Sequence, residues 1–442
     1  MPTSDDVGGE IPRKIIEGKT KIVYSIPDHP GMVRIVAKDD LTAGDGARKD
    51  SFPGKGVLAT RTNRNVFELL RESNIPVAYS CEISESEYEA RQCTMLPYEV
   101  VIQRQVAEKS SARKRDMELK TGTRFDALKV FFFLKTTGPV FKGIEVPKDD
   151  PLITMYSSEG VVVCHPHLPL DNENPRVSIP GHVLFTYGQD PFRMMEELAR
   201  RVFLVLEKAW MLHGYKLLDL KIEFGFDPDG DLVVADVITN DEWRLLDHLG
   251  RHRDKQLFRD GRPIEEIIEA YEEVATVSDR FRCMNGLPTI ILWRGSEKDL
   301  IQPFRDELIR LGSPAYFEEV VCSMHKATRV GLDVLDRVVA ELGSRDAVII
   351  AHVGLSNGLG PSLKGNTTIP VIAVPVDEKD VDSSLRLPSD LPMMTIMRPE
   401  NAIQAAVEIF ALRSPHAYMA RRYVMESYWL NRENSPSFEG SF

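Results

Sequence analysis

Residues 286–295, GLPTIILWRG, form an apolar run of strand length between two glycines, and this stretch decides the class of the second half of the chain. An amphipathic segment that ends in glycine follows it (residues 303–312, PFRDELIRLG), and then a second strand-like segment (residues 315–322, AYFEEVVC). Strands that alternate with helices predict an α/β fold, a parallel, doubly wound sheet covered by helices. The alternation continues through residues 327–343, 346–353 and 369–376.

An acidic segment precedes this alternation. Residues 263–277, PIEEIIEAYEEVATV, have helical spacing, with proline in the first turn. We expect residues 263–285 to connect two domains, one over residues 11–262 and one over residues 286–442, after a flexible N-terminus at residues 1–10. A length of 442 residues agrees with two domains, because a domain usually spans about 100–200 residues.

The first domain mixes strands and helices. Residues 21–26 and 32–37 predict paired strands across the turn PDHPG, and residues 65–72 predict an amphipathic helix. Residues 130–190 are rich in proline and show no regular pattern. The other predicted elements are a helix at residues 193–213 and strands at residues 216–226 and 231–238, around the turn DPDG.

Composition excludes several classes of protein. The net charge of −12 argues against general nucleic-acid binding, which needs a basic surface. The apolar runs are of strand length, far below the ~20 residues of a membrane helix, and the first residues lack the basic and apolar segments of a secretory signal. The five cysteines are scattered, so neither a zinc site nor a disulfide framework is indicated. We expect a cytoplasmic protein that binds neither nucleic acid nor a membrane.

Residues 17–21, EGKTK, stand directly before a predicted strand. Gly18 permits close approach of the backbone to a ligand, and Lys19 and Lys21 are two lysines that can reach the same group. This geometry can bind a polyphosphate, although the spacing of a Walker loop is absent. A solvated strand end is the alternative interpretation.

A second group of charges lies on the predicted strand at residues 216–226. Asp219, Lys221 and Glu223 alternate and therefore share one face of the strand. Antiparallel pairing across the turn DPDG brings Asp236 towards Glu223. Two carboxylates beside a lysine suit Mg-ATP, because Mg²⁺ takes oxygen ligands from one or two carboxylates and from phosphates. The alternative is an ordinary charged sheet face.

Five motifs in this order and spacing resemble the SAICAR synthetase family. The resemblance covers about residues 13–262 and implies an α+β, ATP-grasp-like domain. It also implies that carboxyaminoimidazole ribotide (CAIR) is joined to L-aspartate with ATP, giving SAICAR, ADP and phosphate. The motifs are EGKTKIVY (17–24), DLTAGDG (40–46), LLDLKIEFG (217–225), ADVITNDEWRL (235–245) and DKQLFRD (254–260).

The resemblance implies roles for single residues. Lys221 would also be catalytic, and Glu223 and Asp236 would hold Mg²⁺. The family usually has Gly-Ser where this chain has Lys109-Ser110, and residues 126–182 match it poorly. ATP would be bound by Gly18, Lys19, Lys21, Lys221, Glu223 and Asp236, and the substrate anions by Arg104, Ser110, Asp241, Arg244, Lys255 and Arg259.

Small polar residues follow three strands of the second domain. The carboxyl ends of parallel strands meet at one edge of a sheet, which is where doubly wound folds bind ligands. Such a rim suits a phosphorylated small molecule, and plain turns are the alternative. The three stretches are Gly295-Ser296, Ser323-Met324-His325-Lys326 and Ser356-Asn357-Gly358.

Three motifs, SNGLGP (356–361), KGNTTIPVIAVP (364–375) and SSLRLPSDLP (383–392), resemble the class II aminoimidazole ribotide (AIR) carboxylases. The resemblance covers about residues 287–430. It implies carboxylation of AIR to CAIR with CO2, without biotin or ATP, and a homo-octamer. The resemblance makes His325 the acid–base group, with Lys326 also catalytic, and it implies substrate contacts from Gly295, Ser296, Asp299, Ser323, Gly354, Ser356, Asn357 and Gly358.

The second domain departs from its family at Lys298, Met324, Leu355, Lys364 and His352. Our interpretation is a bifunctional enzyme of de novo purine synthesis, in which the second domain makes CAIR and the first consumes it. Two alternatives remain at this point. One is a diverged ATP-dependent amide ligase with other substrates and an altered or inactive carboxylase half. The other is a non-catalytic assembly protein.

Overall fold

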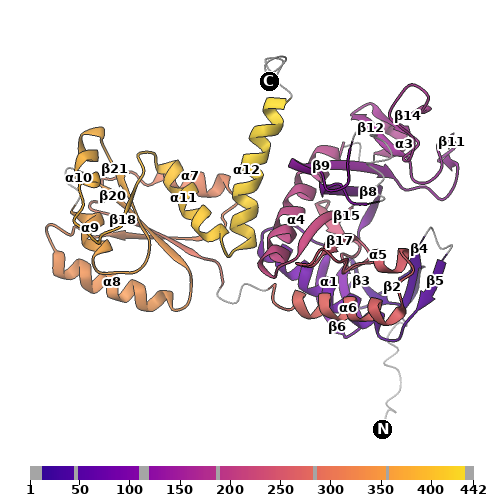
Figure 1. Ribbon diagram of the computed structural model, residues 1–442, viewed down its shortest axis with the longest axis horizontal. Coiled ribbons are helices and arrows are strands. Elements are labelled where there is room, and N and C mark those ends of the chain that lie inside the picture. The colour runs from indigo at the N-terminus through magenta and orange to yellow at the C-terminus, as the bar shows by residue number, and fades with distance from the viewer. Residues whose placement is uncertain are drawn as a thin grey trace, which may run out of the picture. The chain divides into compact units, whose positions relative to one another are not determined.

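The chain, drawn as a computed structural model in Figure 1, divides into two compact units. The first unit comprises residues 1–282 and 429–442, and the second comprises residues 283–428. The structure describes residues 12–43, 48–108, 119–185, 190–281, 286–354 and 358–433. None of the helices in these ranges is long and apolar enough to cross a membrane.

The acidic helix belongs to the first unit. It spans Ile264–Ser278 as α6 and packs against α1 (Lys55–Glu72). Its buried Tyr271 joins an apolar cluster with Phe52. We expected residues 263–285 to connect the domains, but the buried face of α6 makes this helix part of the core of the first unit.

The smaller sheet of the first unit is antiparallel and has five strands. The predicted strand pair around the turn PDHPG is confirmed: it runs from Lys21 opposite Ala37 to Ser25 opposite Val33. In spatial order the strands are β1 (Lys14–Glu17), β2 (Lys21–Ser25), β3 (Met32–Ala37), β7 (Glu87–Arg91) and β6 (Tyr79–Ser84).

The larger sheet has eight strands, and much of it comes from residues 130–190. The expectation that this region is irregular is wrong. Its strands pair across long sequence separations, as Leu152 does with Phe133, and register shifts interrupt their alternation. In spatial order the strands are β14 (Arg176–Pro180), β13 (Gly160–Cys164), β12 (Leu152–Ser157), β9 (Arg124–Leu134), β8 (Thr94–Gln105), β15 (Lys216–Phe226) and β16 (Leu232–Ala235), and β17 (Trp243–Leu246) also pairs with β15.

Helices α1 and α4 (Phe192–Leu212) are the long helices of this unit besides α6. Helix α4 confirms the prediction at residues 193–213 and packs against β8, β9 and β15. Helix α1 begins ten residues before the predicted residues 65–72, because its first half buries polar side chains such as Asn63, which hide the apolar spacing. The short elements are α3 (Gly181–Leu184), α5 (Gln256–Arg259) and the paired strands β4 (Asp40–Ala43) with β5 (Arg48–Ser51) and β10 (Val140–Phe141) with β11 (Ile144–Glu145).

The second unit is built on a parallel sheet, as predicted. Its spatial order places the second strand of the chain beside the first and the remaining three on the other side. Ligands of doubly wound sheets bind where the order reverses, outside the carboxyl ends of the strands. In spatial order the strands are β19 (Tyr316–Val321), β18 (Thr289–Arg294), β20 (Ala347–Val353), β21 (Val371–Pro375) and β22 (Met394–Thr395).

Helices cover both faces of this sheet (Figure 1). Ile290 and Leu292 of β18 pack into one apolar cluster with α7, α11 and α12, while Ile291 and Trp293 pack into another with α8 and α9. This alternation is the one expected of a strand buried on both faces. The helices are α7 (Gln302–Arg310), α8 (Thr328–Leu342), α9 (Leu359–Lys364), α10 (Val381–Leu385), α11 (Pro399–Ala411) and α12 (Pro415–Glu433), with a 3-10 turn, η2 (Glu378–Asp380).

Candidate active sites

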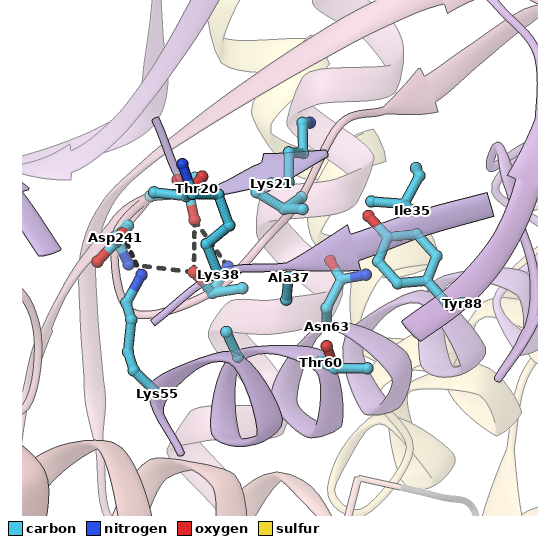
Figure 2. A pocket seen from close by; sticks show the side chains of 14 residues that line it. Thr20, Lys21, Ile35, Ala37, Lys38, Lys55, Thr60, Asn63, Tyr88 and Asp241 are labelled. Carbon is cyan, nitrogen blue, oxygen red and sulfur yellow. Dashed lines mark hydrogen bonds and ion pairs between the residues drawn. The ribbon is translucent and has the colours of Figure 1, made fainter. Parts of the chain in front are cut away.

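A cavity of about 30 Å³ lies in the first unit. Strands β2, β3 and β7, helix α1 and the loop after β16 form its walls, as Figure 2 shows for the labelled side chains. Three lysines line it: Lys21, Lys38 and Lys55. Asp241 and Glu242 line it too, so cations and carboxylates from distant parts of the sequence meet here.

Lys21 is the residue of the EGKTK motif that reaches this cavity. Its ammonium forms an ion pair with Asp236, which directly follows β16 and has a left-handed φ of 65°. Burial lowers the pKa of Lys21 to about 8, although Glu223 acts in the opposite direction. Glu223 stands opposite Ala235 in the sheet, so its carboxylate comes from a position next to that of Asp236, as predicted.

A second pair of lysines neutralises the carboxylates of the large sheet. Lys135 Nζ donates to both oxygens of Glu223, at 2.8 and 2.7 Å. Lys221 Nζ donates to Glu99 Oε1 at 2.9 Å, and although burial lowers the pKa of Lys221, Glu99 and its neighbours raise it above the usual range. The sequence analysis missed Lys135 and Glu99, because both reach the site only through long-range pairing of β8, β9 and β15.

Asp241, one of the predicted substrate residues, is contacted by three side chains. Its carboxylate lies 3.1 Å from Lys55 Nζ and 3.4 Å from Lys255 Nζ, and it accepts a hydrogen bond from Tyr271 Oη at 2.5 Å. Burial alone would raise the pKa of Asp241, and the two ammonium groups hold it well below its usual range. The structure therefore brings Asp241 and Lys255 together, as predicted.

The predicted arginines differ in their surroundings. Arg244 Nη1 donates to Asp219 Oδ2 at 2.6 Å, and Arg259 is exposed on α5. Arg104 is fully buried: its Nε and Nη2 donate to the two oxygens of Glu207 at 2.7 and 3.0 Å. These contacts hold α4 against β8, and a role for Arg104 in substrate binding stays a prediction.

Gly18 and Lys19 are not among the residues that line the cavity. Gly18 forms a turn in which its N–H donates to Lys21 O at 2.9 Å, and Lys19 is exposed. Ser110 and Lys109 lie outside the described residues.

In the second unit, the predicted catalytic residues lie in loops at the carboxyl ends of β18, β19 and β20. His325, after β19, packs against Gly358, after β20, so closely that a Cβ at position 358 would overlap the imidazole. A side chain at position 358 would therefore have to displace the His325 ring. Lys326 is exposed beside His325, and its N–H donates to Ser323 Oγ at 3.4 Å.

In the loop after β18, side chains accept hydrogen bonds from the backbone of the same loop. Asp299 Oδ2 accepts from Ser296 N at 3.0 Å, and Ser296 Oγ accepts from Lys298 N at 3.2 Å. Gly295 and Ser296 are exposed at this edge of the sheet, and so is Gly354 after β20. Leu355, Ser356 and Asn357 lie outside the described residues.

Three departures from the carboxylase family have structural explanations. Met324 is 4% exposed and packs in the apolar cluster under α8, so it belongs to the core. Lys364 Nζ donates to the carbonyl oxygens of Thr367 and Ile369, at 3.4 Å each. His352 is buried and bonds through Nδ1 to Val374 O at 3.0 Å.

Two family models match the chain, SAICAR synthetase over residues 14–139 and 173–277 and AIR carboxylase over residues 290–427. The chain is 33% identical to the rat bifunctional phosphoribosylaminoimidazole carboxylase/phosphoribosylaminoimidazole succinocarboxamide synthetase, covering 95% of each. It is 32% identical to the probable multifunctional protein ADE2 of Caenorhabditis elegans, over 90% of this chain and 89% of that one. A solved SAICAR synthetase in complex with ADP aligns with 60% of this chain and 96% of its own, at 29% identity and a TM-score of 0.47.

Proposed function

Because this chain belongs to the family that fuses SAICAR synthetase to AIR carboxylase, we propose that it catalyses both reactions. The second domain adds CO2 to AIR without biotin and gives CAIR. The first domain joins CAIR to L-aspartate with ATP and gives SAICAR, ADP and phosphate. The observation that carries this proposal is the set of lysine–carboxylate pairs around the cavity of the first unit.

The pairing pattern fits a bound Mg-nucleotide. Lys21 with Asp236 and Lys135 with Glu223 form two neighbouring ion pairs, each of zero net charge. A polyphosphate with Mg²⁺ carries the same alternation of charge, so its oxygens can take the lysines while the metal takes the carboxylates. Mg²⁺ commonly uses one or two protein carboxylates together with phosphate oxygens. Glu223 and Asp236 fit this description, and Mg²⁺ would stabilise charge on the transferred phosphoryl group.

A second group of cations, Lys255, Arg244 and Arg259, suits the anionic groups of the substrates. A carboxylate is a poor acyl donor until ATP converts it to an acyl phosphate, which the amine of aspartate then displaces. Positioning and charge stabilisation are the main contributions of a protein to such a step. Lys255, Arg244 and Arg259 come from one stretch of 16 residues around β17 and α5, and they supply cations for the ribotide phosphate and for the carboxylates.

In the second domain, His325 supports the carboxylation. When CO2 has added to the electron-rich C4 of AIR, a base must remove the proton on that carbon. An imidazole can act as this base near neutral pH. The contact with Gly358 places the ring at the carboxyl edge of the sheet, where ligands of this fold class bind.

A coupled assay tests both reactions at once. Purified protein receives AIR, bicarbonate, ATP, Mg²⁺ and L-aspartate, and CAIR and SAICAR are resolved by mass. We expect CAIR without ATP and SAICAR only with ATP and Mg²⁺. If SAICAR forms from supplied CAIR but no CAIR forms from AIR, only the ligase activity is supported. If neither product forms, the proposal is rejected.

We also propose a homo-octamer in the cytosol, assembled through the second domain. Large apolar side chains stand exposed on that domain, among them Leu300, Ile309 and Leu412, at 68, 68 and 70%. The octamer is the assembly that the resemblance to the class II AIR carboxylases implies. Light scattering at micromolar concentration should give eight times the mass of the chain, and a monomer would reject the octamer.

A further inference from the structure

Arg294 is a buried charge at the edge of the carboxylase sheet. It is the last residue of β18 and only 5% exposed. A buried guanidinium is costly unless it is ion-paired and hydrogen-bonded. Residues that break the rule of an apolar interior are expected at functional sites. The contacts of Arg294 therefore decide what it does.

Its guanidinium holds the loop that follows it. Nη1 donates to the carbonyl oxygens of Ser296 at 3.4 Å and Glu297 at 3.2 Å, and also to that of Asp299. Nη2 forms an ion pair with Glu319 on the neighbouring strand β19. One side chain thus joins three backbone carbonyls of one loop to a carboxylate of the sheet.

On the side away from β19, Arg294 is flanked by strand β20. His352 of β20 stands opposite Arg294 in the parallel register. Its ring bonds to Val374 O and packs edge-on against Phe304, with 5.2 Å between the ring centroids. Burial lowers the pKa of His352, although its bond to Val374 and the charge of Asp299 act in the opposite direction.

The orientation of the loop follows from these contacts. The C=O and N–H groups of a trans peptide point in opposite directions. Carbonyls that turn towards Arg294 therefore turn the adjoining N–H groups away from it. Within the loop, the N–H groups of Ser296, Lys298 and Asp299 are bonded to Asp299 Oδ2, Ser296 Oγ and Ser296 O, so these bonds and the contacts of Arg294 together fix the shape of the loop. The loop includes Ser296 and Asp299, for which we predict substrate contacts.

We propose that Arg294, held by Glu319, is a positioning residue that shapes the Gly295–Asp299 loop for binding of the ribotide. Arg294 acts through the loop and does not itself touch the substrate. The inference rests on the proposed carboxylation of AIR, and it adds a determinant of affinity for this substrate.

The test compares Arg294→Met and Arg294→Lys with the wild type in steady-state carboxylation. Displacement of a binding loop by about 1 Å can cost about 10²-fold, so we expect KM for AIR to rise 10- to 100-fold in Arg294→Met while kcat changes less. Lysine keeps the charge but lacks the planar fork that spans several acceptors, and it should recover only part of the loss.

Arg310→Met is the matched control. Arg310 also belongs to the second unit, and it pairs with Glu307 at 2.7 Å, far from the loop in sequence. Its removal should leave KM for AIR unchanged. Ligation of supplied CAIR reports on the other domain and should stay at the wild-type rate in all variants. If Arg294→Met does not fold, Glu319→Gln retains the arginine and should still raise KM.

Three results would overturn the inference: an unchanged KM for AIR in Arg294→Met, equal effects of the two methionine variants, or a fall in kcat alone. If the wild type does not carboxylate AIR, the proposed function fails by itself. Calorimetric titration with AIR then decides the inference, since equal affinity of wild type and Arg294→Met rejects it.

Discussion

Replacement of Asp241 by asparagine should destabilise the first domain strongly. The Lys55 side chain is 2% exposed and lies 3.1 Å from the Asp241 carboxylate, so the variant leaves a buried ammonium without its counter-charge. Loss of one partner of a buried ion pair costs about 3–5 kcal/mol. Tyr271→Phe removes only one hydrogen bond to the same carboxylate, and it should cost less, about 1.5–3 kcal/mol.

Hydrogen exchange in urea, resolved by peptide, measures this loss separately in each domain. With an m-value of about 3 kcal/mol/M, the midpoint of peptides from α1 and α6 should fall by about 1 M or more. Peptides from β18 and β20 should keep their midpoint, which makes the second domain an internal control. The double variant with Lys55→Met should recover at least about 1 kcal/mol, since the two residues interact directly.

The effect should also depend on pH in a defined direction. The pKa of Asp241 is held below the ordinary value of 3.8, so its contribution to stability is complete above that value and is lost as the pH falls through the lowered pKa. The difference between wild type and Asp241→Asn should therefore shrink below about pH 4. A loss below about 1 kcal/mol at neutral pH, or additive single and double variants, would refute the ion-pair argument.

Three further predictions concern catalysis. Glu223→Gln should remove most ligation of CAIR, because the proposed metal ligand, which is also the partner of Lys135, loses its charge; full activity at ordinary Mg²⁺ concentrations would contradict this role. His325→Ala should abolish CAIR formation and leave ligation of supplied CAIR intact, since a positioned base contributes about 10²–10⁴-fold; the two rates are measured on one preparation. Gly358→Ala should lower carboxylation because its Cβ displaces the His325 ring, and a wild-type rate would show that the ring has room to move.

The second domain shows how much of a fold can be predicted from short stretches of sequence. Strands β18 and β21 are buried along their whole length and are largely apolar runs, while helix α8 keeps one apolar face. Both patterns are complete within about 15 residues. The parallel sheet was therefore predicted, and the structure confirms it.

The large sheet of the first domain shows where local pattern fails. Strands β12, β13 and β14 and the end of β9 lie in a region that we expected to be irregular. These strands pair with partners far away in the sequence, so a short window of residues does not reveal them. Register shifts such as that between Ile153 and Met155 also break the apolar–polar alternation. Helix α1 was predicted only from residue 65 onwards for a related reason, because its first half buries polar groups.

The order of the domains, the EGKTK motif with Lys21, the carboxylates Glu223 and Asp236, and the loop with His325 could be identified from the sequence, since each is a local pattern of residue types. Only the tertiary structure decided which charges meet. Lys135 reaches Glu223 across 88 positions, and Arg294 reaches Glu319 across 25. Such pairs depend on strand register, which the whole sheet sets, because burial of a charge is tolerated only where folding supplies its partner.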